Sequence, residues 1–123
     1  MTLIDKFLKD ESKTFGSNIL RIKGNVFEVS GPINCLLYIK TRKSGNQNWG
    51  ITKNVIERLG KQKKAWFILL LSNPPFPNYF LTADNVEDYV KNRWALNSDG
   101  DYKTSPTFPV ENKFTNSKQL KLG

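Results

Sequence analysis

Two apolar runs set the strongest limit on the fold of this chain. Residues 35–37 read Cys-Leu-Leu in the middle of a β-prone segment, and residues 66–71 read Trp-Phe-Ile-Leu-Leu-Leu. Successive side chains of a strand point to opposite faces of the sheet, so a strand that is apolar on both faces is covered on both. We therefore expect a central third strand over 33–42 and a fully buried strand over 66–71.

The segment before the first apolar run predicts a helix followed by a β-meander. Apolar residues recur at helical spacing over 3–8, which indicates an amphipathic helix of about two to three turns. Two β-prone runs, 19–23 and 26–30, are separated by a Gly-Asn pair that suits a tight hairpin turn. A Gly-Pro pair marks a second turn before the third strand.

The rest of the chain adds a helix, a strand and a further helix. We expect a helix over 52–63, a short strand over 79–81, and a helix that begins at Asp84, with Glu87 in a capping arrangement. Residues 94–96 are either a last strand or a packing segment. The resulting order, α-β-β-β-α-β and then β-α, predicts an α+β fold with a mixed β-sheet flanked by helices.

The length of 123 residues fits one small domain. We assign residues 1–102 to that domain. Residues 103–123 contain two prolines and several Asn and Lys residues but few apolar ones, so we expect a loosely packed C-terminal tail.

The composition excludes several kinds of catalysis. The chain has no histidine and one cysteine, Cys35. Ser-His-Asp and Cys-His nucleophiles, His-ligated zinc and an internal disulfide are therefore excluded. Any catalysis must use carboxylates, lysines, hydroxyls and an oxygen-bound metal such as magnesium.

The net charge favours a polyanionic partner. Nineteen basic residues against eleven acidic ones give +8. Nucleic acid, with DNA foremost, is the first expectation; an anionic membrane surface and an acidic protein follow. The alternative, that the charge serves solubility alone, stays open.

The sequence shows no segment for membrane insertion. The N-terminal residues lack an apolar run of signal-peptide length, and the longest apolar run, 65–71, is far short of the ~20 residues that span a bilayer. We expect a cytoplasmic protein without a membrane partner.

Residues 40–53 form the best binding candidate in the sequence. They combine cations, amides and hydroxyls with one tryptophan, next to an expected helix start. The candidate nucleic-acid-binding residues are Arg42, Lys43, Gln47, Trp49, Thr52 and Lys53. A helix N-terminus and flanking backbone amides bind phosphate well, and Trp49 could stack on an unpaired base. Trp49 could equally be folded into the core.

The element order and a lysine near the end of the third strand resemble the PD-(D/E)XK superfamily, which includes many restriction enzymes and archaeal Holliday-junction resolvases. The resemblance covers roughly residues 3–71 and implies a restriction-endonuclease-like α-β-β-β-α-β core. It implies that Lys40 matches the motif lysine and that Glu28 stands where the first metal-binding acid belongs. Tyr38 occupies the place of the second carboxylate, which departs from the family pattern.

The resemblance implies Mg²⁺ as cofactor, held by Glu28. A phenol with a pKa near 10 is a poor magnesium ligand, so a second carboxylate would have to come from elsewhere. The candidate donors are Glu11, Glu57, Asp99 and Asp101. Strand alternation makes a cross-strand pair of Glu28 and Lys40 plausible, as part of a site or as a plain salt bridge.

Three functions remain open from the sequence. The first is a magnesium-dependent DNA endonuclease or resolvase, with a homodimer left open. The second is a nucleic-acid-binding protein that kept the scaffold and lost the acids, and the missing acid at position 38 favours it. The third is a small accessory or inhibitor protein that binds an acidic protein partner. A cluster of Lys61, Lys63 and Lys64 is interpreted as the solvated end of the second helix, with a role in reading nucleic acid as the alternative.

Overall fold

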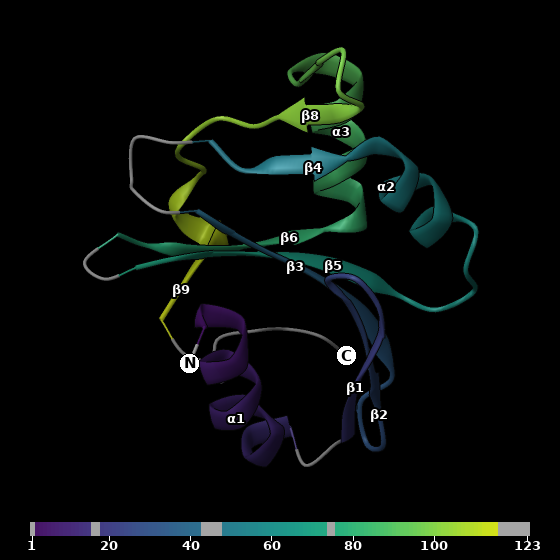
Figure 1. Cartoon of the computed structure of the whole chain (residues 1–123), viewed down its shortest axis with the longest axis vertical. Helices are drawn as coiled ribbons and strands as arrows, with labels where there is room; N and C mark the ends of the chain where they lie inside the picture. The colour runs from purple at the N-terminus through teal and green to yellow at the C-terminus, as the bar shows by residue number, and fades with distance from the viewer. Residues whose placement is uncertain (1, 16–17, 43–47, 74–75, 116–123) are drawn as a thin grey trace.

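The computed structural model describes residues 2–15, 18–42, 48–73 and 76–115 (Figure 1). The first half contains α1 (Leu3–Phe15), β1 (Asn18–Lys23), β2 (Val26–Ser30), β3 (Cys35–Arg42), β4 (Gly50–Thr52) and α2 (Lys53–Gly60). The second half contains β5 (Trp66–Ser72), β6 (Asn78–Thr82), α3 (Ala83–Asn92), β7 (Ala95–Leu96), β8 (Asp101–Lys103), the short 3-10 helix η1 (Val110–Asn112) and β9 (Lys113–Phe114). In this described part, no helix is long and apolar enough to cross a membrane.

A six-stranded mixed sheet forms the centre of the molecule. Its strand order is β1-β2-β3-β5-β6-β9. β1, β2 and β3 form an antiparallel meander, and β3 pairs in parallel with β5 after the chain crosses over through α2. The α+β class, the mixed sheet, the N-terminal meander and the central position of β3 are confirmed.

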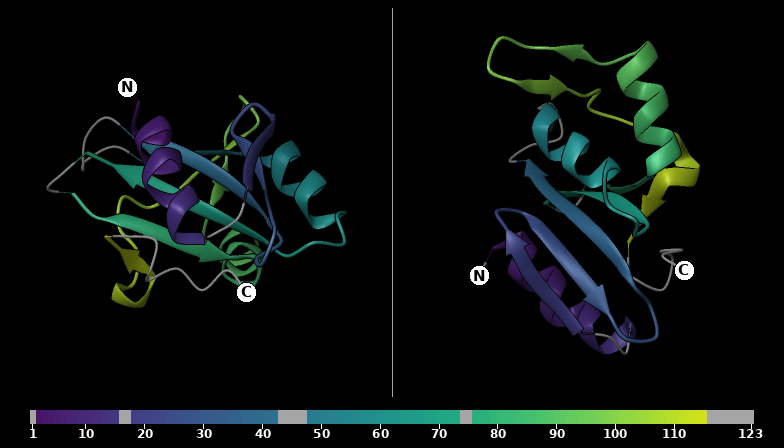
Figure 2. Two further views of the ribbon diagram at one scale, coloured as in Figure 1. Left: turned by 90° about the horizontal axis from the view of Figure 1, so that it is seen from below. Right: turned by 90° about the vertical axis from the view of Figure 1, so that its right-hand side faces the viewer.

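Each face of this sheet has its own hydrophobic core. On one face α1 packs Phe7 among side chains such as Phe27 and Leu37. Figure 2 shows α1 lying across this face. On the other face α2, α3 and a second sheet cover a larger core. All seven residues of β5 are buried, which is why its sequence has no alternation.

The first hairpin follows the predicted turn. Gly24 adopts a φ of 56°, which glycine tolerates without steric cost. The β1–β2 register is irregular between Arg21 and Lys23, where Lys23 pairs with Val26. This irregularity adds Ile22 as an extra residue on the β1 side of the ladder.

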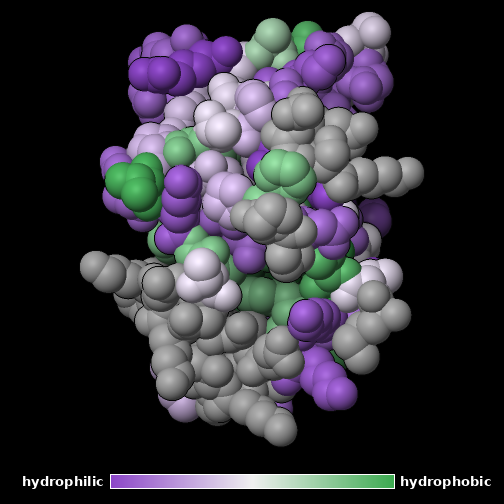
Figure 3. Space-filling model, turned by 90° about the vertical axis from the view of Figure 1, so that its left-hand side faces the viewer, coloured by the Kyte–Doolittle hydropathy of each residue, from purple (hydrophilic) through white to green (hydrophobic). Residues whose placement is uncertain are grey.

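A second, three-stranded sheet was missing from the sequence prediction. Its order is β4-β8-β7. β4 lies inside a segment predicted as loop and helix start, and residues 94–96 do contain the short strand β7. Figure 3 shows hydrophilic side chains gathered at the end of the molecule where the β7–β8 hairpin lies.

The predicted loose tail is wrong for residues 103–115. Thr104 is 1% exposed, and Phe108 belongs to the larger core. Phe114 belongs to the α1-side core, and β9 pairs with β6 as an edge strand of the main sheet. The structured domain therefore continues past 102, because a few well-spaced aromatic residues anchor this segment. Residues 116–123 lie outside the described residues.

The third helix is capped by other residues than the predicted Asp84 and Glu87. The helix begins one position before Asp84, and Thr82 is its N-cap. The Thr82 hydroxyl accepts a hydrogen bond from the backbone N–H of Asn85, and the Asn85 side chain accepts one from the backbone N–H of Thr82. Asn85 thus does the work that Glu or Gln does in the usual capping box.

Candidate nucleic-acid interface

Arg42 is a buried structural residue. Its side chain donates a hydrogen bond from Nε to the hydroxyl of Ser72 at 2.9 Å and another from Nη1 to the carbonyl of Pro106 at 2.6 Å. The guanidinium carbon lies 3.7 Å from the ring centroid of Trp49. Burial lowers the pKa of Arg42, and the charge interaction with Tyr79 acts in the opposite direction. Because the residue is only 5% exposed, its prediction as an exposed phosphate contact is wrong.

Trp49 also lies in the core. It is 1% exposed, and its indole N–H donates to the carbonyl of Leu71. Its ring packs edge-on against Tyr79. Of the two interpretations open from the sequence, core packing is correct, and stacking on a base is not available to this ring.

The start of α2 is occupied by internal contacts. The backbone N–H of Thr52 donates to the hydroxyl of Tyr38 at 3.3 Å, and that of Lys53 donates to the carbonyl of Gly100 at 3.1 Å. The Thr52 hydroxyl donates to Asp101 at 2.8 Å. These amides are therefore engaged within the protein and do not form the predicted phosphate site.

Of the three remaining predicted nucleic-acid contacts, one lies on the described surface and two lie outside the described residues. Lys53 is on the surface, 3.9 Å from the Glu57 carboxylate in an ion pair along α2. Lys43 and Gln47 lie outside the described residues. The described residues of the 40–53 segment therefore do not form the binding surface that the sequence predicts.

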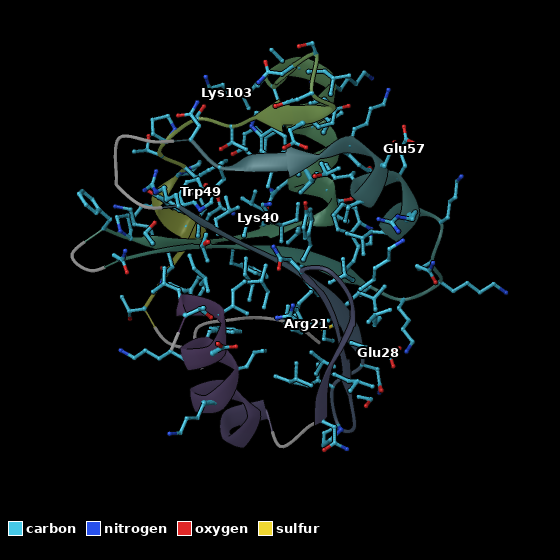
Figure 4. All side chains as sticks on the ribbon, viewed as in Figure 1. Arg21, Glu28, Lys40, Trp49, Glu57 and Lys103 are labelled. Carbon is cyan, nitrogen blue, oxygen red and sulfur yellow. The ribbon has the colours of Figure 1, made fainter. Side chains whose placement is uncertain are left out.

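Glu28, Tyr38 and Lys40 share one face of the sheet but do not converge. In the β2–β3 register Glu28 lies opposite Leu36, four residues before Lys40, a separation of about 13 Å at the usual rise per residue. Figure 4 shows Glu28 and Lys40 well apart on the sheet. The Glu28 carboxylate instead accepts a hydrogen bond from the ammonium of Lys64, in an ion pair. The predicted Glu28–Lys40 pair is therefore wrong.

This arrangement does not fit the magnesium site that the family resemblance implies. Tyr38 is 3% exposed and holds the start of α2 through its hydroxyl. The ammonium of Lys40 lies 5.8 Å from the centroid of the Tyr38 ring, a cation–π distance. Among the described residues no group of three or more acidic or cysteine side chains could hold a metal ion. Of the candidate donors of a second carboxylate, Glu57 is paired with Lys53 and Asp101 accepts a hydrogen bond from the Thr52 hydroxyl.

Comparison with known proteins gives no independent guide. No family model and no curated protein matches this chain.

A groove between α2 and the β1–β2 hairpin brings together cations from several elements, and we call it the basic groove. Its volume is about 530 Å³. The lining residues are Ile22, Lys23, Val26, Glu28, Leu36, Val55, Arg58, Leu59, Lys61, Gln62, Lys63 and Lys64. Five of these twelve residues are cations, and Glu28 is the one acid among the described residues that line it.

Strand register explains why cations from distant segments meet here. Glu28 lies opposite Leu36, and Leu36 lies opposite Trp66 across the parallel β3–β5 pair. The backbone N–H of Leu36 also donates to the carbonyl of Ala65. The segment that enters β5 therefore lies beside the start of β3, and the long Lys64 side chain reaches across to the Glu28 carboxylate.

The cations of the basic groove form its rim. Lys23, Arg58, Lys61 and Lys63 are all exposed. The sequence interpretation of Lys61, Lys63 and Lys64 as a solvated helix end therefore missed that β1 and β2 face them. The signal in the sequence was the run of lysines before a buried strand, and its significance depends on a strand register that local patterns do not encode.

Proposed function

We propose that this protein binds nucleic acid, with DNA as the foremost candidate, through the basic groove. The observation that carries the proposal is the rim of five cations around a groove in which Glu28 is the one acid among the described lining residues. That acid is itself paired with Lys64, so its charge is compensated within the protein. The net charge of +8 supports the same partner class.

The physical basis is the release of counterions. Nucleic acid carries condensed cations, and each phosphate that a protein lysine or arginine neutralises releases some of them. The rim cations are exposed and lie on two sides of the groove, on the hairpin and on the segment from α2 to β5. A phosphate backbone that runs along the groove would contact both sides. Binding should therefore weaken steeply as salt rises.

The proposal favours binding over cleavage. The α-β-β-β-α-β order of the first seven elements, with β4 inserted before α2, supports the resemblance to the nuclease superfamily. Three features argue against magnesium-dependent hydrolysis at the implied positions. Glu28 is in an ion pair, Tyr38 is buried, and Lys40 lies far from Glu28 along the sheet. A nuclease-like scaffold used for binding accounts for both observations.

The test is a titration of labelled DNA at two salt concentrations, with and without Mg²⁺. The informative variant is Lys61→Gln/Lys63→Gln, which removes two rim charges. Its control is Lys91→Gln/Lys113→Gln, which removes the same charge from exposed positions that do not line the groove. The rim variant should lower affinity and flatten the salt dependence by a slope of about 1.4 to 1.8, and the control should change both far less.

Equal effects of the two double variants would contradict the groove as the site and leave only a general charge effect. No binding of DNA or RNA by the unmodified protein would overturn the proposal. In that case the acidic protein partner becomes the better hypothesis.

A further inference from the structure

The floor of the basic groove is apolar and partly open to solvent. Five apolar side chains line the groove together with the cations, and we call them its floor: Ile22, Val26, Leu36, Val55 and Leu59. Ile22 is 55% exposed, so part of this floor is open to solvent. Simple phosphate binding does not need such a surface, since apolar side chains offer nothing to a phosphate oxygen. The groove therefore combines two kinds of recognition.

We propose that the groove binds single-stranded nucleic acid, with an unpaired base on the apolar floor and the flanking phosphates on the cationic rim. This inference rests on the proposed function and specifies its substrate. Removal of apolar surface from water favours binding, and only an occupant with an exposed apolar face can gain from it here.

Duplex DNA can contact the cations of the rim but cannot cover the apolar floor. Its bases are stacked inside the helix, and its outer surface is a charged backbone. A duplex resting on the lysines would leave Ile22 and its neighbours in water. An unpaired nucleotide can turn its base inward while its phosphates stay at the rim. The groove volume of about 530 Å³ lies within the range of pockets that hold small organic ligands.

The aliphatic character of the floor also predicts that the groove has little preference among the bases. The side chains that contact the base are aliphatic, and Gln62 is the one neutral polar residue among the described lining residues. Aliphatic contact does not read the hydrogen-bonding edge of a base. Different homopolymers should therefore bind with similar affinity, in contrast to a site that reads sequence through several amides.

The test compares three labelled probes of equal length: oligo-dT, the same backbone with abasic sites, and a duplex. Oligo-dT should bind roughly 5- to 10-fold more tightly than the abasic strand, because only the base of the former can bury apolar area of the floor. Ile22→Ser should reduce this difference without changing the salt slope, since Ile22 is the most exposed of the floor residues. Leu20→Ser is the matched control, since Leu20 is 68% exposed on the same strand and does not line the groove.

The possible outcomes distinguish a failure of this inference from a failure of the proposed function. Equal affinity for oligo-dT and the abasic strand, with salt-sensitive binding of both, overturns the base contact and leaves polyanion binding in place. Tighter binding of the duplex than of oligo-dT also overturns it. Failure to bind any of the three probes overturns both proposals. An Ile22→Ser effect that Leu20→Ser reproduces would assign the effect to strand β1 in general and overturn the floor contact.

Discussion

The carboxylate of Glu28 on β2 is paired with the ammonium of Lys64, which precedes β5. This contact joins the N-terminal hairpin to the segment that follows α2. It also favours one of two roles for Glu28. A carboxylate that holds a lysine moderates the charge of the basic groove, whereas a metal ligand would need its oxygens for the ion.

Arg42 contributes stability and not binding. Replacing it with Met should lower the free energy of unfolding by about 2–4 kcal/mol, because Ser72 and Pro106 lose their buried hydrogen-bond donors and Trp49 loses a cation over its ring. Chemical denaturation measures the change. Arg93→Met, at an exposed position, should stay within about 0.5 kcal/mol. An Arg42 variant of normal stability with impaired DNA binding would contradict this assignment.

The segment after β8 is part of the domain. Phe108 packs against Trp49, Tyr79 and Tyr89, so Phe108→Ala should cost about 3–5 kcal/mol. Val110, two residues later, is 74% exposed, and Val110→Ala should change stability by less than about 0.5 kcal/mol. Thermal unfolding of the two variants distinguishes an anchored segment from a loose tail, for which both changes would be small.

Cys35 should resist modification in the folded protein. Its thiol is fully buried, and burial raises its pKa to about 11, with a smaller opposing effect from Lys64. The unfolded chain, with a pKa near 9.0, loses the thiol proton first as pH rises. This group therefore contributes stability that is present below about pH 9 and declines towards pH 11.

Labelling with a thiol reagent at pH 8 measures this directly. Slow reaction in the native state and rapid reaction in denaturant are expected, since the thiolate is the reactive form. Rapid labelling of the folded protein would show that the β3 face towards α1 opens to solvent.

Local sequence patterns were sufficient to predict most of the helices and strands of the main sheet. The unbroken apolar run of β5 and the Gly-Asn turn between β1 and β2 are signals that a few residues carry by themselves. The three-residue β4 was missed because so short a strand is defined by its pairing with β8 and not by its own composition. The Thr82 cap was missed because Asn85 replaces the usual Glu or Gln.

The site was harder to predict because it depends on contacts between distant residues. Arg42 and Trp49 are both consistent with a binding loop in the sequence, and only the packing of Phe108 and Pro106 against them shows that they are buried. The Glu28–Lys64 contact depends on two successive strand registers. No local pattern of charge encodes which lysine reaches that carboxylate.

The most direct test of the account is the DNA affinity of Glu28→Gln as a function of salt, with and without Mg²⁺. Glu57→Gln is the matched control, because Glu57 is also paired with a lysine, Lys53, but neither residue lines the basic groove. We predict that Glu28→Gln releases Lys64, tightens binding and steepens the salt slope by about 0.7 to 0.9, and that Glu57→Gln has a smaller effect. Weaker binding of Glu28→Gln would contradict the account. Mg²⁺-dependent cleavage that this substitution abolishes would also contradict it and would make Glu28 a metal ligand.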